Sequence, residues 1–265
     1  MSITHYKSGP FSLRTLRLGR PAGPDGGDTD PVPLLYVHGY ERHPGEAPFL
    51  SRLAGDREVL APELPGYGES QGVDHLTDVH DVALLLRDIV EGHGYEHVDV
   101  VGHSLGGMLA AEFAVVAPDL VRSLVLVGSY GLWLDEHPMA DPFVLTPEQL
   151  ADAKWHDPTR AAEETAIEVA ETALEKAIER TRNIGTATKF MWPIPDRGLS
   201  RRLRYLQART LVVHGEDDGL VPTEHARELA RLIPNAELEL VAEAGHVPMF
   251  ECEDEFVALV QKFLR

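Results

Sequence analysis

The sequence predicts an α/β protein in which helices flank a mostly parallel central sheet. Short apolar runs alternate along the chain with segments whose apolar residues recur at helical spacing. One such run, LLYVHGY at 34–40, is typical of a strand buried on both faces. The chain has 265 residues, of which 43% are hydrophobic, and this is enough for a sizeable core without disulfide bonds.

The elements of the first half follow from local patterns. FSLRTLRLG at 11–19 alternates in hydropathy and predicts an edge strand. The segment 20–33 is rich in Gly, Pro and Asp and predicts a mobile hairpin loop. The segment 76–94 has apolar residues at helical spacing and a glycine near its end. Further strands are expected at 34–40, at the start of 57–70, at 97–104 and at 121–129, and helices at 76–94 and 105–118.

The pattern changes from about residue 130 to residue 199, where no strand is evident. TRAAEETAIEVAETALEKAIERTRN at 159–183 predicts one long helix with a glutamate-rich face. Beyond this segment we expect strands at 209–218 and 236–246 and helices at 223–234 and 253–264. We therefore predict a core formed by 1–129 and 200–265, with a helical cap at 130–199 inserted after the sixth strand.

Composition excludes several classes of function. The net charge is −19, from 43 acidic and 24 basic side chains, which disfavours nucleic acid or an anionic membrane surface as a partner. Cys252 is the single cysteine, and the polar start MSITHYKSGP does not resemble a signal peptide, so a reducing cytoplasm is expected. The 13 histidines form no HExxH or Cys/His pattern. We expect a small-molecule substrate and no metal or cofactor.

The stretch GHSLG at 102–106 carries the clearest chemical signal. It matches the G-x-S-x-G pattern and lies between a predicted strand and a predicted helix. A strand that turns into a helix within a few residues holds Ser104 in a strained conformation with its hydroxyl presented, and glycines are needed where side chains would collide. The start of the helix also brings the Leu105 N–H and the positive end of the helix dipole near the serine.

A serine nucleophile needs a base, and the base needs an orienting carboxylate. His246 follows a predicted strand near the end of the chain and is the candidate base. The preceding strand ends in Asp217 and Asp218, and local propensity does not choose between these two carboxylates. We interpret His103 as a packing residue and His214 as a satisfied core residue.

The chain resembles the α/β-hydrolase superfamily, in particular its capped ester and C–C bond hydrolases. The resemblance runs through YVHGY, PGYGES, VGHSLGG, HGEDDGLVP and AGHVPMFE, and so covers nearly the whole length. The family's G-x-x-D-x-x-V-P pattern implies Asp218 as the orienting acid and Asp217 as a solvated neighbour. The resemblance also implies the Tyr40 backbone N–H as the second oxyanion donor, beside that of Leu105.

The resemblance implies a serine hydrolase with the triad Ser104, His246 and Asp218. The family's haloalkane dehalogenases and epoxide hydrolases have an aspartate at the position of Ser104. Many of its C–C hydrolases of ring-cleavage dienoates have Asn and Trp where this chain has His103 and Val247. We therefore favour a small or medium apolar carboxylic ester or lactone, hydrolysed through an acyl-enzyme. The alternatives are a C–C bond hydrolase and a non-catalytic small-molecule binder.

The substrate pocket is the least defined part of the prediction. The candidates are Tyr40, beside the oxyanion loop, Trp133 and Met191, near the two ends of the cap, and Val247, after the histidine. Packing of the cap against the core is the competing explanation for each apolar residue of the cap.

Overall fold

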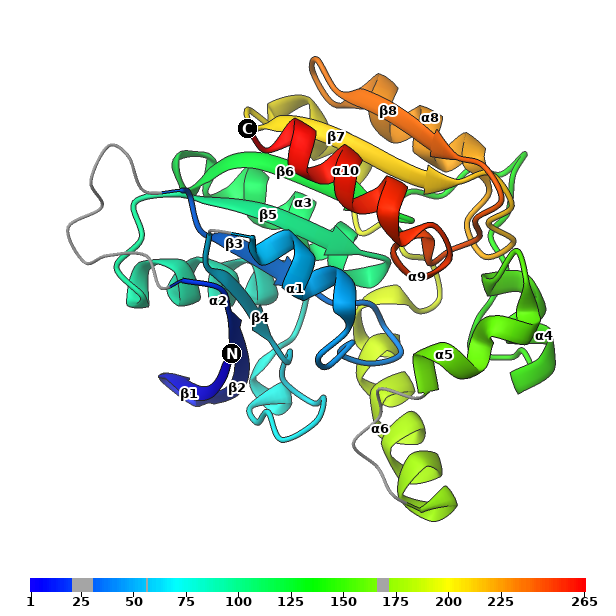
Figure 1. The fold of residues 1–265 in the computed structure, drawn as a ribbon, viewed down its shortest axis with the longest axis horizontal. Coiled ribbons are helices and arrows are strands. Elements are labelled where there is room, and N and C mark those ends of the chain that lie inside the picture. Colours follow the sequence, from blue (N-terminus) through cyan, green and yellow to red (C-terminus); the bar gives the residue numbers. More distant parts are fainter. Residues whose placement is uncertain (21–30, 56, 166–171) are drawn as a thin grey trace.

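The computed structural model describes residues 1–20, 31–55, 57–165 and 172–265 (Figure 1). Most of the predicted hairpin loop at 20–33 lies outside these ranges. Within these ranges, an eight-stranded sheet has the order β1-β2-β4-β3-β5-β6-β7-β8. Its strands are β1 (Ser2–Ser8), β2 (Phe11–Leu18), β3 (Leu34–Val37), β4 (Val59–Pro62), β5 (Val98–His103), β6 (Val121–Val127), β7 (Arg209–Gly215) and β8 (Glu237–Val241).

The sheet is mostly parallel, which confirms the predicted fold class. Only the β1–β2 and β2–β4 pairs are antiparallel, and the pairs from β4 to β8 are parallel. The prediction that 11–19 is an edge strand is wrong. β1 pairs with β2 along its whole length and takes the edge position, and a tight turn in which Gly9 has a φ of 51° joins the two strands.

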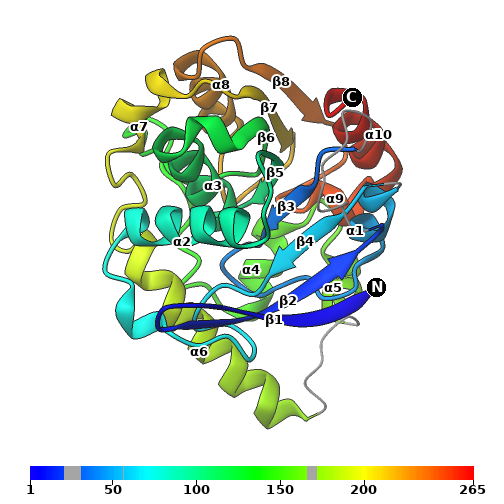
Figure 2. The same cartoon turned by 90° about the vertical axis from the view of Figure 1, so that its left-hand side faces the viewer.

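Helices cover both faces of the sheet, as Figure 2 shows. One face carries α2, α3 and α8, and the other carries α1 and α10. Within the described ranges, no helix is long and apolar enough to span a bilayer. The helices of this core are α1 (Pro48–Ala54), α2 (Val79–Gly92), α3 (Leu105–Val116), α7 (Leu199–Arg202), α8 (Thr223–Leu232), α9 (Pro248–Glu251) and α10 (Glu253–Phe263).

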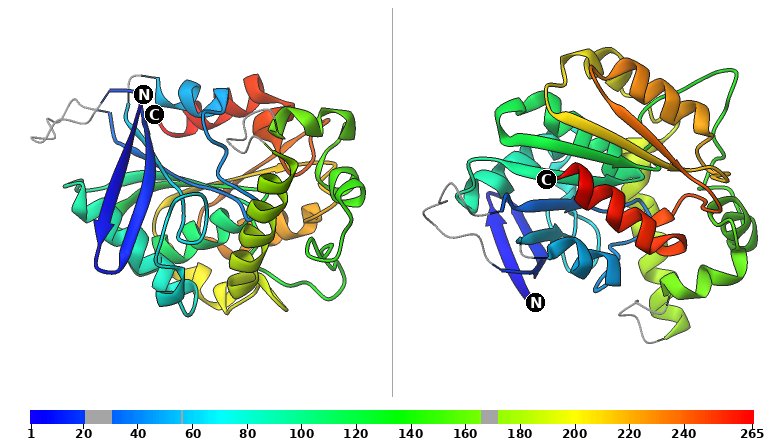
Figure 3. Two further views of the ribbon diagram at one scale, coloured as in Figure 1. Left: turned by 90° about the horizontal axis from the view of Figure 1, so that it is seen from below. Right: turned by 45° about the horizontal axis from the view of Figure 1, so that its top comes forward.

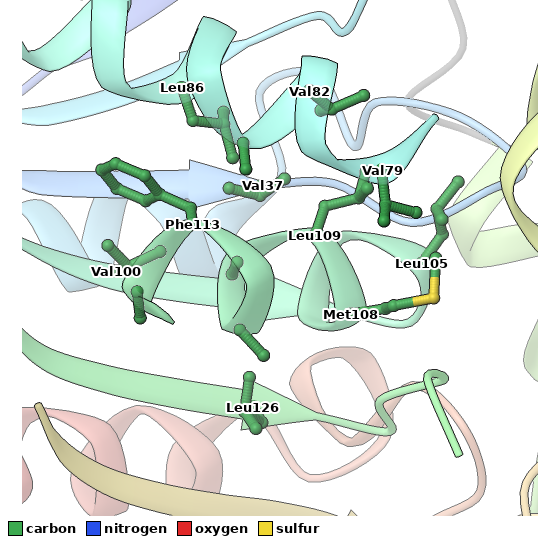
Figure 4. Close-up of a cluster of buried hydrophobic side chains, with 14 of the residues drawn as sticks. Val37, Val79, Val82, Leu86, Val100, Leu105, Met108, Leu109, Phe113 and Leu126 are labelled. Carbon is green, nitrogen blue, oxygen red and sulfur yellow. The ribbon is translucent and has the colours of Figure 1, made fainter. Parts of the chain in front are cut away.

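The packing of α3 decides where the functional loops lie. Figure 4 shows Leu105 and Leu109 of α3 meeting Val79 of α2. The first turns of α3 are buried on nearly every side, which suits their high content of glycine and alanine. A Cβ on Gly106 would lie 2.1 Å from the Val37 carbonyl oxygen, so only glycine lets this helix approach β3 so closely.

The segment between β6 and β7 contains α4 (Pro147–Lys154), α5 (Ala161–Thr165) and α6 (Ala173–Met191). These helices lie toward the carboxyl ends of the parallel strands (Figure 1). The β1–β2 hairpin lies at the opposite end of the molecule from α4 and α5 (Figure 3). In open α/β sheets, ligands bind at the carboxyl ends of the strands. The inserted helices therefore lie over the edge where a site is expected.

The prediction of one continuous helix over 159–183 is wrong. Thr172 has extended backbone dihedrals and caps a new helix, α6, which continues to Met191. The Thr172 hydroxyl accepts the Glu175 N–H, and the Glu175 carboxylate accepts the Thr172 N–H. This reciprocal capping box has the T-x-x-E signature, so the sequence did contain a helix start at this point.

Replacing Thr172 by alanine is expected to destabilise the start of α6 by about 1 kcal/mol, because the Glu175 N–H loses its acceptor. Amide hydrogen exchange of the first turn of α6 measures this loss. The control is Thr181→Ala in the same helix. The Thr181 hydroxyl donates to the Ala177 carbonyl, and alanine is the better helix former there. Equal exchange in both variants would contradict the capping role.

Candidate active site

The turn between β5 and α3 places Ser104 at the carboxyl end of the sheet. Ser104 has φ 60° and ψ −122°, a conformation that costs about 1–3 kcal/mol in a non-glycine residue. Its N–H donates to the Val127 carbonyl at 2.9 Å, and its own carbonyl accepts the Tyr130 N–H at 3.2 Å. The neighbouring strand β6 therefore holds the strained turn in place.

A continuous hydrogen-bonded chain links three side chains that lie far apart in the sequence. His246 Nε2 is 2.9 Å from Ser104 Oγ, and His246 Nδ1 is 2.8 Å from Asp218 Oδ2. All three side chains are buried. With Nδ1–H donating to an ionised Asp218, Nε2 is left free to accept the serine proton. This is the arrangement that a serine nucleophile and its base require.

Asp218 is held as an ionised acceptor. Its Oδ1 accepts the N–H groups of Leu220 and Val221, both at 2.9 Å. Burial alone would raise the pKa of Asp218, but the facing His246 and these hydrogen bonds outweigh it and lower the pKa. Asp217 points elsewhere, because its Oδ2 lies 2.8 Å from His156 Nδ1. The structure therefore brings Asp218, and not Asp217, to His246.

Two further histidines contact members of this row of hydrogen-bonded side chains. His103 Nε2 donates to the His246 carbonyl at 3.0 Å, which fits the packing role predicted for it. His214 Nε2 lies 2.7 Å from the Val221 carbonyl and 3.2 Å from Asp218 Oδ2. Sequence reasoning treated His214 as an ordinary core residue and missed its contact with the aspartate. Its position four residues before Asp218, at the end of β7, was the available signal.

The predicted oxyanion donors come from two segments that both lie beside Ser104. Leu105 is the first residue of α3, so its N–H has no acceptor within that helix. In the second segment, a Cβ built on Gly39 would lie 3.2 Å from Ser104 Cβ. The loop that carries the Tyr40 N–H therefore passes directly beside the serine. Both N–H groups remain predicted donors.

Two pockets adjoin this arrangement. One, of about 20 Å³, is lined by Ser104, His246 and Tyr40 among others. The second, of about 160 Å³, is mostly apolar in its lining side chains and includes Trp133, Met191, Tyr130, Phe143 and Trp192. Tyr40, Trp133 and Met191 thus line pockets beside the site. The fully buried Val247 belongs to the hydrophobic core and lines neither of these two pockets.

A buried cluster of charges borders the smaller pocket, and sequence reasoning missed it. Lys154, at the end of α4, pairs with Glu41 of the oxyanion loop and with Glu164 of α5. Burial would lower the pKa of Lys154, but the facing carboxylates of Glu164 and Glu41 raise it. The Lys154 carbonyl also accepts the His246 N–H at 2.7 Å. Lys154, a residue of the inserted segment, therefore contacts both the loop that carries Tyr40 and Glu41 and the loop that carries His246.

Comparison with known proteins identifies a family that this chain matches over most of its length. A family model described as the alpha/beta hydrolase family matches residues 34–259. A 2-hydroxymuconate semialdehyde hydrolase of Pseudomonas putida is 30% identical over 263 residues, covering 91% of this chain and 89% of that protein.

Solved structures share the fold at low sequence identity. An esterase from Rhodococcus sp. ECU1013 superposes with a TM-score of 0.79 at 21% identity, covering 100% of this chain and 98% of the other. A meta-cleavage product hydrolase from Pseudomonas fluorescens IP01 gives a TM-score of 0.76 at 21% identity, covering 96% of this chain and 94% of the other.

Proposed function

The chain belongs to the alpha/beta hydrolase family, and from this premise we propose that it is a serine hydrolase that cleaves a carboxylic ester or lactone. The observation that carries the proposal is the chain of hydrogen bonds from Asp218 through His246 to Ser104, at 2.8 and 2.9 Å. Residues 130–199 serve as a cap over this site, and residues 1–129 and 200–265 form the catalytic core.

The proposed reaction has two stages. Ser104 Oγ attacks the ester carbonyl while His246 Nε2 takes its proton, and the N–H groups of Tyr40 and Leu105 hold the oxyanion. Collapse of this intermediate breaks the C–O bond, and the alkoxide leaves with the proton from His246. A water molecule, deprotonated by His246, then attacks the acyl-serine and releases the acid and free Ser104.

A second candidate function is hydrolysis of a C–C bond in a ring-cleavage product. The name of the P. putida relative, a 2-hydroxymuconate semialdehyde hydrolase, favours it. Two residues favour the ester instead. His103 stands where many C–C hydrolases have Asn, and here its side chain holds the His246 carbonyl. Val247, where they have Trp, is buried in the core.

Steady-state kinetics on two substrate sets distinguishes these functions. The purified protein is assayed with p-nitrophenyl acetate, butanoate and hexanoate, and with 2-hydroxymuconate semialdehyde. We expect kcat/KM to be at least about tenfold higher for the best ester, a preference of more than 1 kcal/mol. Turnover of the semialdehyde alone would reverse the order of the two candidates.

Ser104→Ala is the control for both substrate sets. It is expected to abolish the activity, because it removes the hydroxyl that lies 2.9 Å from His246 Nε2. The same negligible turnover by wild type and Ser104→Ala on every substrate would contradict the hydrolase proposal and favour a binder on this fold.

A further inference from the structure

Two buried phenol hydroxyls beside the site have no hydrogen-bond partner among the described residues. They belong to Tyr40 and Tyr130, whose side chains are each 2% exposed. An unsatisfied buried hydroxyl costs about 1–3 kcal/mol, so most buried polar groups have a partner. Two such groups next to one another at a candidate active site point to a ligand that satisfies them.

The two rings contact each other, and each lines one of the two pockets. Their centroids lie 6.2 Å apart in an edge-to-face arrangement. Tyr40 lines the pocket that contains Ser104, and Tyr130 lines the larger aromatic pocket. The Tyr130 ring also packs against the His246 ring, with centroids 5.7 Å apart. A substrate held at Ser104 and extending toward the aromatic pocket would therefore lie against these two rings.

The hydroxyls can act as hydrogen-bond donors. Burial raises the pKa of both phenols well above the usual value, so both are protonated at neutral pH. Carboxylates surround Tyr130: Asp218, Glu41 and Asp141 add to the rise of its pKa, and Asp141 lines the larger pocket together with it. Glu41 and Glu164 act on Tyr40 in the same direction, against an opposing Arg180. This surrounding favours an uncharged acceptor over a carboxylate.

We propose that the Tyr40 and Tyr130 hydroxyls form a subsite for a second, uncharged oxygen acceptor of the substrate, such as an ether, hydroxyl or ketone oxygen close to the scissile carbonyl. The inference rests on the proposed hydrolase function. It narrows the substrate class from apolar esters to esters that carry this additional oxygen on the acyl or the alcohol side.

Isosteric substrate pairs test the subsite. On the acyl side, p-nitrophenyl methoxyacetate is compared with p-nitrophenyl butanoate, and on the alcohol side 2-methoxyethyl butanoate with butyl butanoate. The ratio of kcat/KM within each pair is measured for wild type, Tyr40→Phe and Tyr130→Phe. Dividing the wild-type ratio by the variant ratio cancels the intrinsic reactivity of the esters.

We call this quotient the coupling, and we expect it to be about fivefold or more for at least one substrate pair, which is the size expected for one neutral hydrogen bond. Tyr95→Phe is the control, because the Tyr95 hydroxyl already donates to Glu58 at 2.7 Å. For Tyr95→Phe, the coupling should be equal to one for both substrate pairs. Couplings within about twofold of one for both site variants on both pairs would overturn the proposal, since the hydroxyls would then be satisfied by water or by nothing.

Two further measurements keep the outcomes separate. p-Nitrophenyl hemisuccinate should be a poorer substrate than the methoxyacetate, and the reverse order would overturn the choice of an uncharged acceptor. The melting temperature of the ligand-free Tyr→Phe variants should be equal to or above that of wild type, because no internal bond is lost. A clear fall would mean a structural partner and overturn the proposal. Failure of the hydrolase proposal itself is recognised independently, by equal turnover in Ser104→Ala.

Discussion

Replacing Asp218 by asparagine is expected to lower kcat by about 10³–10⁴-fold while leaving the fold intact. The asparagine Oδ1 can still accept the Leu220 and Val221 N–H groups, which hold the loop. Its NH₂ group, however, takes the position of the oxygen that faces His246 Nδ1. The imidazole then carries its proton on Nε2 and has no lone pair there to accept the proton of Ser104.

Asp217→Asn is the matched control, one residue away. The Asp217 carboxylate contacts His156 at the surface, so we expect kcat to change by less than about threefold, as for a surface site. Burst kinetics with p-nitrophenyl butanoate compares kcat in the two variants, and circular dichroism checks that both are folded. An Asp218→Asn enzyme with wild-type kcat would refute the role of Asp218. A large loss of kcat in Asp217→Asn would show that the orienting acid is Asp217 instead.

The parts of the site that could be predicted from the sequence are those that short local sequence patterns identify. The turn at Ser104 is one, because the strand, the glycines and the helix start all lie within about ten residues of each other. Local propensity could not choose between Asp217 and Asp218, since both follow the same strand, β7, within three residues. The resemblance to a family made that choice, and in the structure Asp218 meets His246.

The remaining features depend on contacts between distant segments. Lys154 meets Glu41 across 113 positions, and nothing in the sequence around either residue marks the pair. Tyr130 was within reach of prediction, because it follows the end of β6, the strand next to β5 in the sheet. Adjacent parallel strands bring their carboxyl ends together, so a residue at that point lies near Ser104. The edge strand β1 was missed because its side chains are at most half-buried.

Replacing Lys154 by methionine is expected to destabilise the protein by about 3 kcal/mol or more, because it leaves the carboxylates of Glu41 and Glu164 buried without their shared cation. Arg42 also faces Glu41 and remains in the variant, but Lys154 is the larger attractive influence on that carboxyl. For a chain of this size the loss corresponds to a fall in Tm of roughly 6–12 °C. Activity should fall as well, since Lys154 joins the loop of Tyr40 to that of His246.

The pH dependence of this loss identifies its cause. In the wild type, burial would raise the pKa of Glu41, and the facing Lys154 brings it below its ordinary value. Without Lys154, the effect of burial on the pKa of Glu41 is less opposed, so this carboxyl binds a proton more readily in the folded variant than in the unfolded chain. The loss of stability relative to wild type therefore becomes smaller as the pH falls from 8 to 5. Urea unfolding at both pH values measures it. Lys189→Met, which removes a lysine that bonds only to backbone carbonyls among its described contacts, serves as the control. The triple variant Glu41→Gln, Lys154→Met, Glu164→Gln should recover most of the loss. A deficit that is independent of pH and persists in the triple variant would mean that Lys154 acts through packing, and not through its charge.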